Sequence, residues 1–284
     1  MAVTIRWKDN SLIEEGHRIY KSSTYFTPDS LPAPLVDLGP DIEEYEDTAS
    51  NAGENWYIVS AYILGYEAFS EPFIPGLLSF GIGPDVFVGG DLFAGYLGEV
   101  QSTDFITGDT LASNIGLTAG TAQNSDVPWW KFALDGEILY IPKKSLRHSI
   151  SWDDINNVNA VYDDSSAPVV TIGSYDFRVT LMTGAEADPT VEENGIGSEW
   201  NRLIYRVHND TPTDQIGNNW AFYNTANTNI GTGNGRYAWC QETTASTATV
   251  RVSRGYASLS DFDSGSYTNN NTYNGWRPVL RLIQ

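Results

Sequence analysis

The chain has 284 residues, 41% of them apolar, and a net charge of −20 from 16 basic and 36 acidic residues. This length predicts about two domains of roughly 150 residues, each with room for a core, and the composition is that of a soluble folded protein. The basic residues form no cluster that could bind phosphates, which excludes nucleic acid as a partner.

Cys240 is the only cysteine, so the chain forms no internal disulfide. The first ten residues, MAVTIRWKDN, lack the apolar run of a secretion signal. The longest apolar region, residues 73–88, is broken by proline and glycine and cannot span a membrane. We therefore expect a protein that is made in a cytoplasm and does not insert into membranes.

Short β-prone segments separated by turn residues dominate the first 75 residues. Residues 31–48 are rich in proline and acids, so they allow a loop and a short edge strand but no central strand. The pattern predicts strands at residues 3–7, 17–20, 56–63 and 66–69, with a turn at Gly65.

These segments resemble a fibronectin type III-like module, because VTIRW, HRIYKS, IEEYEDT, NWYIVSAY and GYEAFSEP follow one another as its strands do. The resemblance implies a β-sandwich over residues 1–75. It begins at the second strand of the family, so we expect the missing edge strand to come from the connector or from a neighbouring copy. The positions that match the family pattern are Trp7, Tyr20, Tyr57, Val59, Ala61, Ser70 and Pro72.

Residues 76–128 are rich in glycine and contain acids but no basic residue. Their segments GDLFAGYLGEV and LASNIGLTAG are typical of short helices or loops. We interpret this stretch as a connector that mediates assembly between copies.

The character changes at Trp129, and residues 129–284 are expected to fold alone as an α+β domain. Asp135 and Gly136 predict a tight hairpin turn. Ser151 and Ser198 each precede a segment with the features of a capped helix. Residues 175–182 alternate as a strand, so the whole chain is predicted to be mainly β with minor α.

The second half resembles a domain that recurs at the C-terminus of tailed-phage virion structural proteins. RVSRGYA followed by GWRPVL is also similar to the closing strands of the C-type-lectin-like and formylglycine-generating-enzyme folds. The first resemblance implies a virion structural protein. The second implies that its last domain has a C-type-lectin-like fold. The segments that carry the first resemblance are WWKFALDGEILYIPKKSLRHSISWDD, YDFRVTLMTGA, GSEWNRLIY, NNWAFYN, GNGRYAWCQET, VSRGYASLS and GWRPVLRL.

No pattern of catalytic or metal-binding residues is present. Cys240 lies beside a tryptophan without a nucleophile signature, which favours a small core residue over a reactive thiol. The acidic pairs at 153–154 and 163–164 and the DFDSG segment are explained by helix capping and turns rather than by calcium. We expect no catalytic residue, metal or cofactor. We expect Arg277 either to stack on an aromatic ring or to pair with an internal acid such as Glu199, and a structural ion pair is the favoured interpretation.

Residues 256–274 mix Tyr, Ser, Asn and Gly, a composition shared by adaptable binding loops and by merely solvated ones. The flanks VRVSRG and GWRPVLRLI are expected to pair as neighbouring strands and hold this loop at the exposed end of the domain. The candidate receptor contacts are Tyr256, Tyr267, Tyr273 and Asn274.

Together these observations favour a non-enzymatic structural component of a tailed-phage virion, tail- or fibre-associated, that is assembled in the host cytoplasm. Its partners would be other virion proteins, further copies of itself in a homo-oligomer, and a host surface glycan or protein for attachment. One alternative is a head-decoration or collar protein with a purely architectural role. A particle-bound glycan hydrolase is a further alternative, since acids are plentiful.

Overall fold

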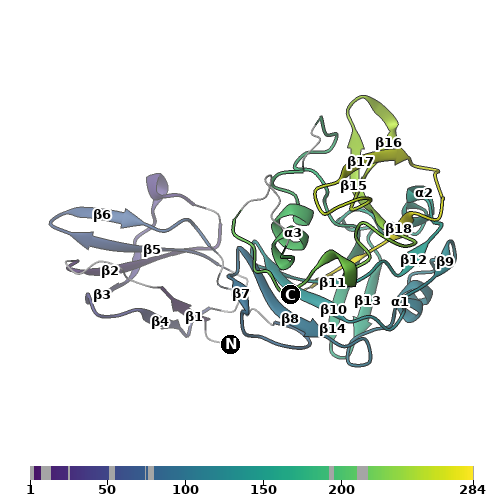
Figure 1. Ribbon diagram of the computed structural model, residues 1–284. Helices are drawn as coiled ribbons and strands as arrows, with labels where there is room; N and C mark the ends of the chain where they lie inside the picture. Colours follow the sequence, from purple (N-terminus) through teal and green to yellow (C-terminus); the bar gives the residue numbers. More distant parts are fainter. Residues whose placement is uncertain are drawn as a thin grey trace. The chain divides into compact units, whose positions relative to one another are not determined.

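The computed structural model is mainly β, which confirms the fold class predicted from the sequence. It divides into two compact units, Met1–Ser79 and Phe80–Ile283 (Figure 1). The residues that the structure describes are 3–7, 14–24, 26–50, 55–73, 75, 80–191, 195–209 and 217–283.

The first unit is a small antiparallel β-sandwich. Val3 and Ile5 of the smaller sheet pack on Ile19, Tyr57 and Val59 of the larger one. The smaller sheet pairs β1 (Val3–Arg6) with β4 (Glu44–Asp47). The larger sheet has the order β3 (Pro34–Leu38), β2 (Gly16–Ser22), β5 (Trp56–Ile63) and β6 (Tyr66–Phe69).

Local chemistry explains these strands. In β1 the apolar side chains are buried and the polar ones between them are exposed, as expected for a strand with one face on a core. Leu64 and Gly65 have φ values of 48° and 83°, and they form the tight turn that joins β5 to β6. Pro34 begins β3, which lies at an edge of its sheet as the prolines predicted.

Strand β1 pairs with β4 alone, and within the described residues no strand lies along its other edge. The backbone N–H of Trp7 donates to Glu43 O. Because alternate N–H groups of a strand point to the same side, the backbone N–H of Ile5 also points toward β4. The N–H groups of Thr4 and Arg6 therefore point toward the open edge.

The second unit contains a seven-stranded antiparallel sheet whose two faces both carry a core. Trp129 and Ala133 of one strand pack on one face, and Trp130 and Phe132 of the same strand pack on the other. In order the strands are β13 (Val169–Ile172), β14 (Tyr175–Thr180), β19 (Val279–Leu282), β11 (Glu137–Pro142), β10 (Trp129–Leu134), β8 (Ala94–Val100) and β7 (Gly89–Gly90).

The hairpin predicted at Asp135 and Gly136 is confirmed. Both residues have positive φ values, 49° and 88°, and they connect the paired strands β10 and β11. Because both faces of the sheet are buried, β10 is buried along its whole length and shows no polar face.

The structure corrects the interpretation of residues 76–128 as a connector. Strand β8 pairs with β10 along its whole length, and Leu97 and Leu111 are fully buried in the core of the second unit. The segment is therefore part of this unit from Phe80 onward, and residues 76–79 lie outside the described residues. The LASNIGLTAG segment supplies the last four residues of α1 (Gly108–Asn114), whereas GDLFAGYLGEV contains the whole of β8 and no helix.

A six-stranded sheet completes the second unit. Its strands are antiparallel except for β15 and β18, which run parallel. In order they are β17 (Phe262–Ser266), β16 (Thr247–Arg254), β15 (Tyr237–Thr244), β18 (Asn274–Trp276), β12 (Arg147–His148) and β9 (Thr121–Ala122).

The flanks of residues 256–274 do not pair as the sequence predicted. β16 lies between β15 and β17, whereas β18 lies on the other side of β15 and β19 belongs to the seven-stranded sheet. The stretch is also not one loop, because β17 forms a hairpin with β16. Strand neighbours here come from distant parts of the chain, which local patterning does not reveal.

Short helices fill the remaining gaps. The Ser151 side chain accepts a hydrogen bond from Asp154 N and caps α2 (Trp152–Asn156), as predicted. Ser198 Oγ accepts from Asn201 N at the start of the other predicted helix, which is a π-helical stretch, Trp200–Ile204, continued by α3 (Tyr205–Val207). Among the described residues, no helix combines the length and the apolar character needed to cross a membrane. Single 3₁₀ turns cover Pro28–Ser30 and Thr225–Asn227.

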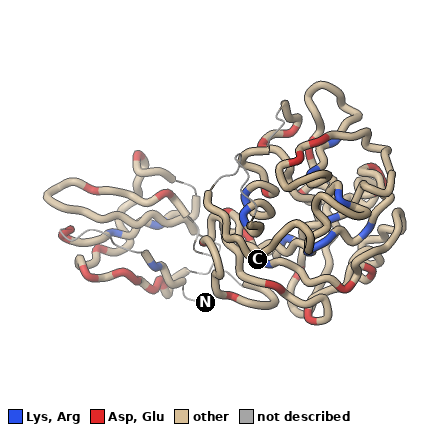
Figure 2. Tube along the Cα trace, viewed as in Figure 1, with Lys and Arg blue, Asp and Glu red and all other residues tan. Residues whose placement is uncertain are grey.

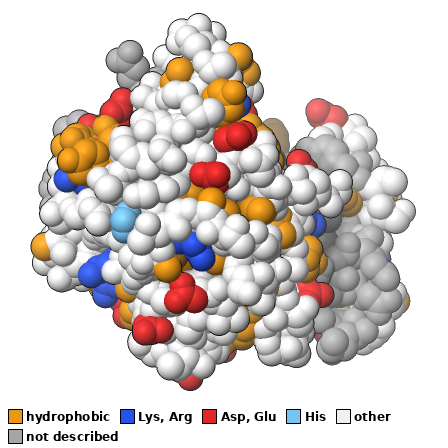
Figure 3. Space-filling model, turned by 90° about the vertical axis from the view of Figure 1, so that its right-hand side faces the viewer, with side chains coloured by type: hydrophobic (Ala, Val, Ile, Leu, Met, Phe, Trp, Pro, Cys, Tyr) orange, Lys and Arg blue, Asp and Glu red, His pale blue; other side chains and the backbone are white. Residues whose placement is uncertain are grey.

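The charges of the two units are placed differently. Figure 2 shows mainly acidic positions along the first unit and basic positions on inner segments of the second. Arg254, Arg277, Arg281 and Lys131 are all buried in the second unit. The face of the molecule in Figure 3 is mostly uncharged polar surface with small separated apolar and acidic groups, in keeping with its Asn-, Thr-, Ser- and Gly-rich loops.

Candidate functional site

Three tyrosines converge at one end of the six-stranded sheet. Tyr237 begins β15, Tyr256 follows the end of β16, and Tyr273 precedes β18. Because β16 runs antiparallel to β15 and β18 runs parallel to it, these three positions meet at the same end of the sheet. We call Tyr237, Tyr256 and Tyr273 the tyrosine cluster.

The rings of the tyrosine cluster contact one another. Tyr237 and Tyr256 are stacked, with centroids 4.2 Å apart and an interplanar angle of 13°. Tyr256 and Tyr273 meet edge to face, at 5.7 Å and 69°. Both are favoured aromatic geometries, so the cluster presents rigid ring faces rather than free side chains.

Arg236 lies between two of these rings. Its guanidinium carbon is 4.1 Å from the centroid of Tyr256 and 4.1 Å from that of Tyr273, which places the cation over both aromatic faces. Its Nε is buried and has no hydrogen-bond partner among the described residues. The stacked guanidinium therefore fixes the orientation of Tyr273, the most exposed ring of the cluster at 41%.

Tyr237 is held by Asp263 of β17, whose carboxylate accepts a hydrogen bond from the tyrosine hydroxyl. Burial and this hydrogen bond raise the pKa of the Tyr237 hydroxyl. The phenol is therefore neutral at physiological pH and acts as a fixed donor rather than as a base.

The structure brings together only two of the four residues singled out from the sequence. Tyr256 and Tyr273 belong to the tyrosine cluster. Tyr267 follows β17 and lies 5.8 Å from the guanidinium of Arg251, packed against the core. Asn274 is 3% exposed and its amide donates to Asn269 O, so its role is to hold the chain.

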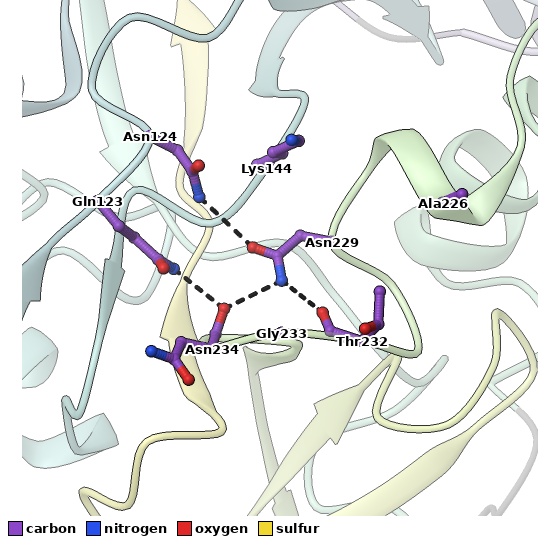
Figure 4. Close-up of a pocket in the computed structure, with 8 residues that line it drawn as sticks. All are labelled: Gln123, Asn124, Lys144, Ala226, Asn229, Thr232, Gly233 and Asn234. Atoms are coloured by element: carbon purple, nitrogen blue, oxygen red, sulfur yellow. Dashed lines mark hydrogen bonds between the residues drawn. The ribbon is translucent and has the colours of Figure 1, made fainter.

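A small polar pocket lies beside the segment that leads to the cluster (Figure 4). It has a volume of about 310 Å³, at the lower end for small-molecule sites. We call it the amide pocket. Its lining residues are Gln123, Asn124, Lys144, Ala226, Asn229, Thr232, Gly233 and Asn234.

Asn229 organises this pocket. Its Nδ2 donates to Thr232 O at 2.7 Å and to Asn234 O at 3.0 Å, which closes the loop over residues 229–234. Asn124 Nδ2 donates to Asn229 Oδ1 at 3.4 Å, and Gln123 Nε2 donates to Asn234 O at 3.2 Å. Figure 4 shows these side chains meeting around the backbone of the loop.

A buried cationic group lies behind the backbone of the pocket. Arg277 is 1% exposed, and its Nη2 donates to Thr228 O and to Lys143 O, the carbonyls of the residues before Asn229 and Lys144. Burial lowers the pKa of Arg277 to about 9, so it remains charged at neutral pH. The predicted pairing of Arg277 with Glu199 is wrong: Glu199 binds Arg281 Nη2 at 2.5 Å.

His208 completes this region as a neutral group. It bonds through Nδ1 to Ile204 O at 2.6 Å and through Nε2 to Thr228 Oγ1 at 2.9 Å. Burial lowers the pKa of His208 to about 4. Nδ1 faces a carbonyl oxygen, which can only accept, and therefore carries the ring proton.

Two further reactive side chains of this unit, Cys240 and Glu242, are enclosed. Cys240 is fully buried in the core, as expected of a small core residue, and burial raises its pKa. Glu242 is 2% exposed, and both its oxygens accept from Gly184 N. Among the described residues, no three His, Cys, Asp or Glu side chains are grouped as a metal site.

No family model matches this chain, and neither a curated protein nor a solved structure matches it. The resemblances described above therefore depend on the sequence segments that carry them.

Sequence reasoning missed Arg236, Tyr237 and the whole amide pocket. The pocket combines residues 123–124, 144 and 226–234, which no spacing rule connects. The adjacent pair Arg236 and Tyr237 in GNGRY was the available signal, because an arginine beside a tyrosine after a glycine-rich turn is typical of a presented contact.

Proposed function

We propose that this chain is a non-enzymatic structural component of a tailed-phage virion, and that its second unit contacts a host surface receptor through the tyrosine cluster. The observation that carries the proposal is the pre-ordered group of Tyr256, Tyr273 and Arg236 at the end of a rigid sheet. Aromatic rings and arginine are the side chains that contribute most to binding at interfaces. The succession of sequence segments that resembles phage virion proteins supports the assignment to a virion.

The enclosure of Glu242 and Cys240 supports a binding role over catalysis by either of these two side chains. The Glu242 carboxylate faces backbone N–H groups, and the Cys240 thiol lies in a core. Neither can reach a substrate without a rearrangement of the sheet around it.

A head-decoration or collar role is the second candidate, and the β7–β8 hairpin favours it. Val88 and Phe93 flank β7, an edge strand, with 55% and 73% of their surfaces exposed. Exposed apolar side chains at a sheet edge are suited to contact with another copy or another virion protein.

Host adsorption separates the two roles. Particles that carry Tyr256→Ser together with Tyr273→Ser should assemble normally and adsorb to the host about tenfold less or worse, because both rings are contact groups. Tyr66→Ser is the matched control, since Tyr66 is 80% exposed in the first unit and should not matter. Normal adsorption by the double variant would favour the architectural role.

A further inference from the structure

The amides of the pocket are fixed in orientation by backbone carbonyls. Asn124 Nδ2 donates to Ser145 O at 3.0 Å, and Gln123 Nε2 donates to Asn234 O. A carbonyl can only accept, so these bonds identify which end of each amide is the nitrogen. The oxygens of Asn124 and Gln123 and the whole amide of Asn234 have no partner among the described residues, and they remain for a ligand.

Lys144 is the only charged residue of the pocket lining. Its neighbour Lys143 forms an ion pair with Glu99 at 2.7 Å, but Lys144 has no carboxylate partner in the described part of the chain. In a chain with 36 acids and 16 bases, a pocket with one cation and no acid is a local exception.

Arg277 adds to the positive potential of this pocket. Its charge is buried directly behind the backbone of Lys143 and Thr228, and across the described residues no carboxylate pairs with it. A charge in a poorly solvated position acts over a longer range than one at the surface. The pocket should therefore attract an anionic group more strongly than the net charge of −20 suggests.

From these observations we propose that the amide pocket binds one unit of an acidic carbohydrate, with the sugar carboxylate on Lys144 and the ring hydroxyls on Gln123, Asn124 and Asn234. Hydroxyl groups both donate and accept, and amides offer both partners in one plane. Because the amides are already oriented, little entropy is lost when the sugar binds. The volume of about 310 Å³ suits a single ring rather than an extended peptide.

The pocket and the tyrosine cluster are adjacent along the chain. Asn234 lines the pocket and Arg236 contacts the tyrosines, and two residues span at most about 7 Å. A glycan whose acidic unit occupies the pocket can thus reach the aromatic faces with its next unit. This inference rests on the proposed receptor-binding function and names the class of ligand.

The test is a titration of the whole protein with glucuronate and with glucose, followed by saturation-transfer NMR. The two sugars differ only in the carboxylate. Glucuronate should bind at least tenfold more tightly than glucose. Lys144→Gln should remove this preference and bring glucuronate to the level of glucose, whereas Asn234→Ala should weaken both sugars.

Arg6→Gln, in the first unit and exposed, is the charge-matched control and should change nothing. Circular dichroism of each variant checks that the fold is intact. The proposal is overturned if neither sugar binds, if both bind equally to the natural protein, or if Lys144→Gln keeps the preference. Acetate that competes as well as glucuronate would overturn it too, by showing a simple anion site.

Failure of this proposal and failure of the proposed function are distinguishable. The Tyr256→Ser, Tyr273→Ser variant should keep glucuronate binding in the pocket while its particles lose adsorption. Sugar binding with normal adsorption would overturn the receptor role and leave the site itself intact.

Discussion

The two units differ in how far they enclose positive charge, although both contain ion pairs. In the first unit Lys21 pairs with Asp47 at 2.8 Å and Arg18 pairs with Glu67 at 3.1 Å. In the second unit Lys131 and Arg277 are buried against backbone carbonyls instead, Lys131 Nζ donating to Pro84 O at 2.7 Å. The small sandwich keeps its cations half-exposed beside acids, whereas the larger unit can enclose them.

Core size explains this difference. The described part of the first unit has two clusters of five and three buried apolar residues, while both faces of the large sheet in the second unit are covered. A larger unit buries a greater fraction of its surface and can offset the cost of an enclosed cation. An uncompensated charge can therefore persist behind the amide pocket.

The largest expected effect concerns the boundary of the second unit. A fragment of residues 80–284 should fold alone, whereas one of residues 129–284 should not, because the latter lacks β8 and the buried Leu97 and Leu111. Circular dichroism and proton NMR of both fragments check this. A well-folded shorter fragment would restore the connector interpretation of residues 76–128.

Removal of Glu199 should destabilise the second unit strongly. Glu199 and Arg281 are both nearly buried, and loss of one partner leaves a charge in the interior. Arg281 retains its ion pair with Glu137 at 3.1 Å, so the loss is limited. We expect Glu199→Ala to lower the free energy of unfolding, measured by urea denaturation, by about 3 kcal/mol. Glu44→Ala in the first unit, where the pair with Arg6 is exposed, should show no measurable change. Equal effects would contradict the contrast between the units.

The stability of the two units should change with pH in opposite directions. Burial alone raises the pKa of Asp47, but hydrogen bonds from Lys21 and Tyr57 outweigh it and hold this pKa at about 2. The carboxylate thus stabilises the first unit above pH about 4, and this stability is lost as the pH falls from 4 toward 2. Burial raises the pKa of Glu242 to about 7, so the second unit loses stability as the pH rises from 4.5 toward 7.

Urea unfolding followed by NMR signals of Ile58 and Leu203 reports on each unit separately. Asp47→Asn should remove the loss of stability of the first unit between pH 4 and pH 2, as reported by Ile58. Glu242→Gln should remove the loss of stability of the second unit between pH 4.5 and pH 7, as reported by Leu203. The change from Glu242 should be on the order of 3 kcal/mol. Parallel pH profiles for the two signals would contradict the assignment.

The smallest expected effect lies at the open edge of β1. The amides of Thr4 and Arg6 should exchange with solvent faster than that of Ile5, which points toward β4. Hydrogen exchange at single-residue resolution measures this. Slow exchange at Thr4 and Arg6 at a high protein concentration, but not at a low one, would show that a neighbouring copy supplies the edge strand.

Local signals in the sequence were sufficient for the first unit. Strands β5 and β6 were predicted to the residue, because alternation and the turn at Leu64 and Gly65 act over neighbouring positions. The turn at Asp135 and Gly136 and the cap at Ser151 in the second unit were found for the same reason.

Long-range partners explain what the sequence did not reveal. Strand β8 contains Gly95 and Gly98 and has no strand-like composition, and it is extended because β10 pairs with it. Arg277 and Arg281 are four residues apart, so in an extended chain their side chains would point to the same face. The local pattern therefore could not decide which of the two arginines pairs with Glu199. The amide pocket was not predicted for the same reason, because its lining residues come from three separate segments of the chain.

The position of β18 and β19 has a consequence for biosynthesis. Tyr140 pairs with Leu280, a partner 140 residues later in the chain, and the same final segment inserts β18 between β15 and β12. At about 5–20 residues per second, a ribosome needs roughly ten seconds or more to deliver it. Until then both sheets lack an inner strand and expose apolar faces to solvent. A nascent chain interrupted before residue 279 should therefore be a substrate for chaperones and proteases.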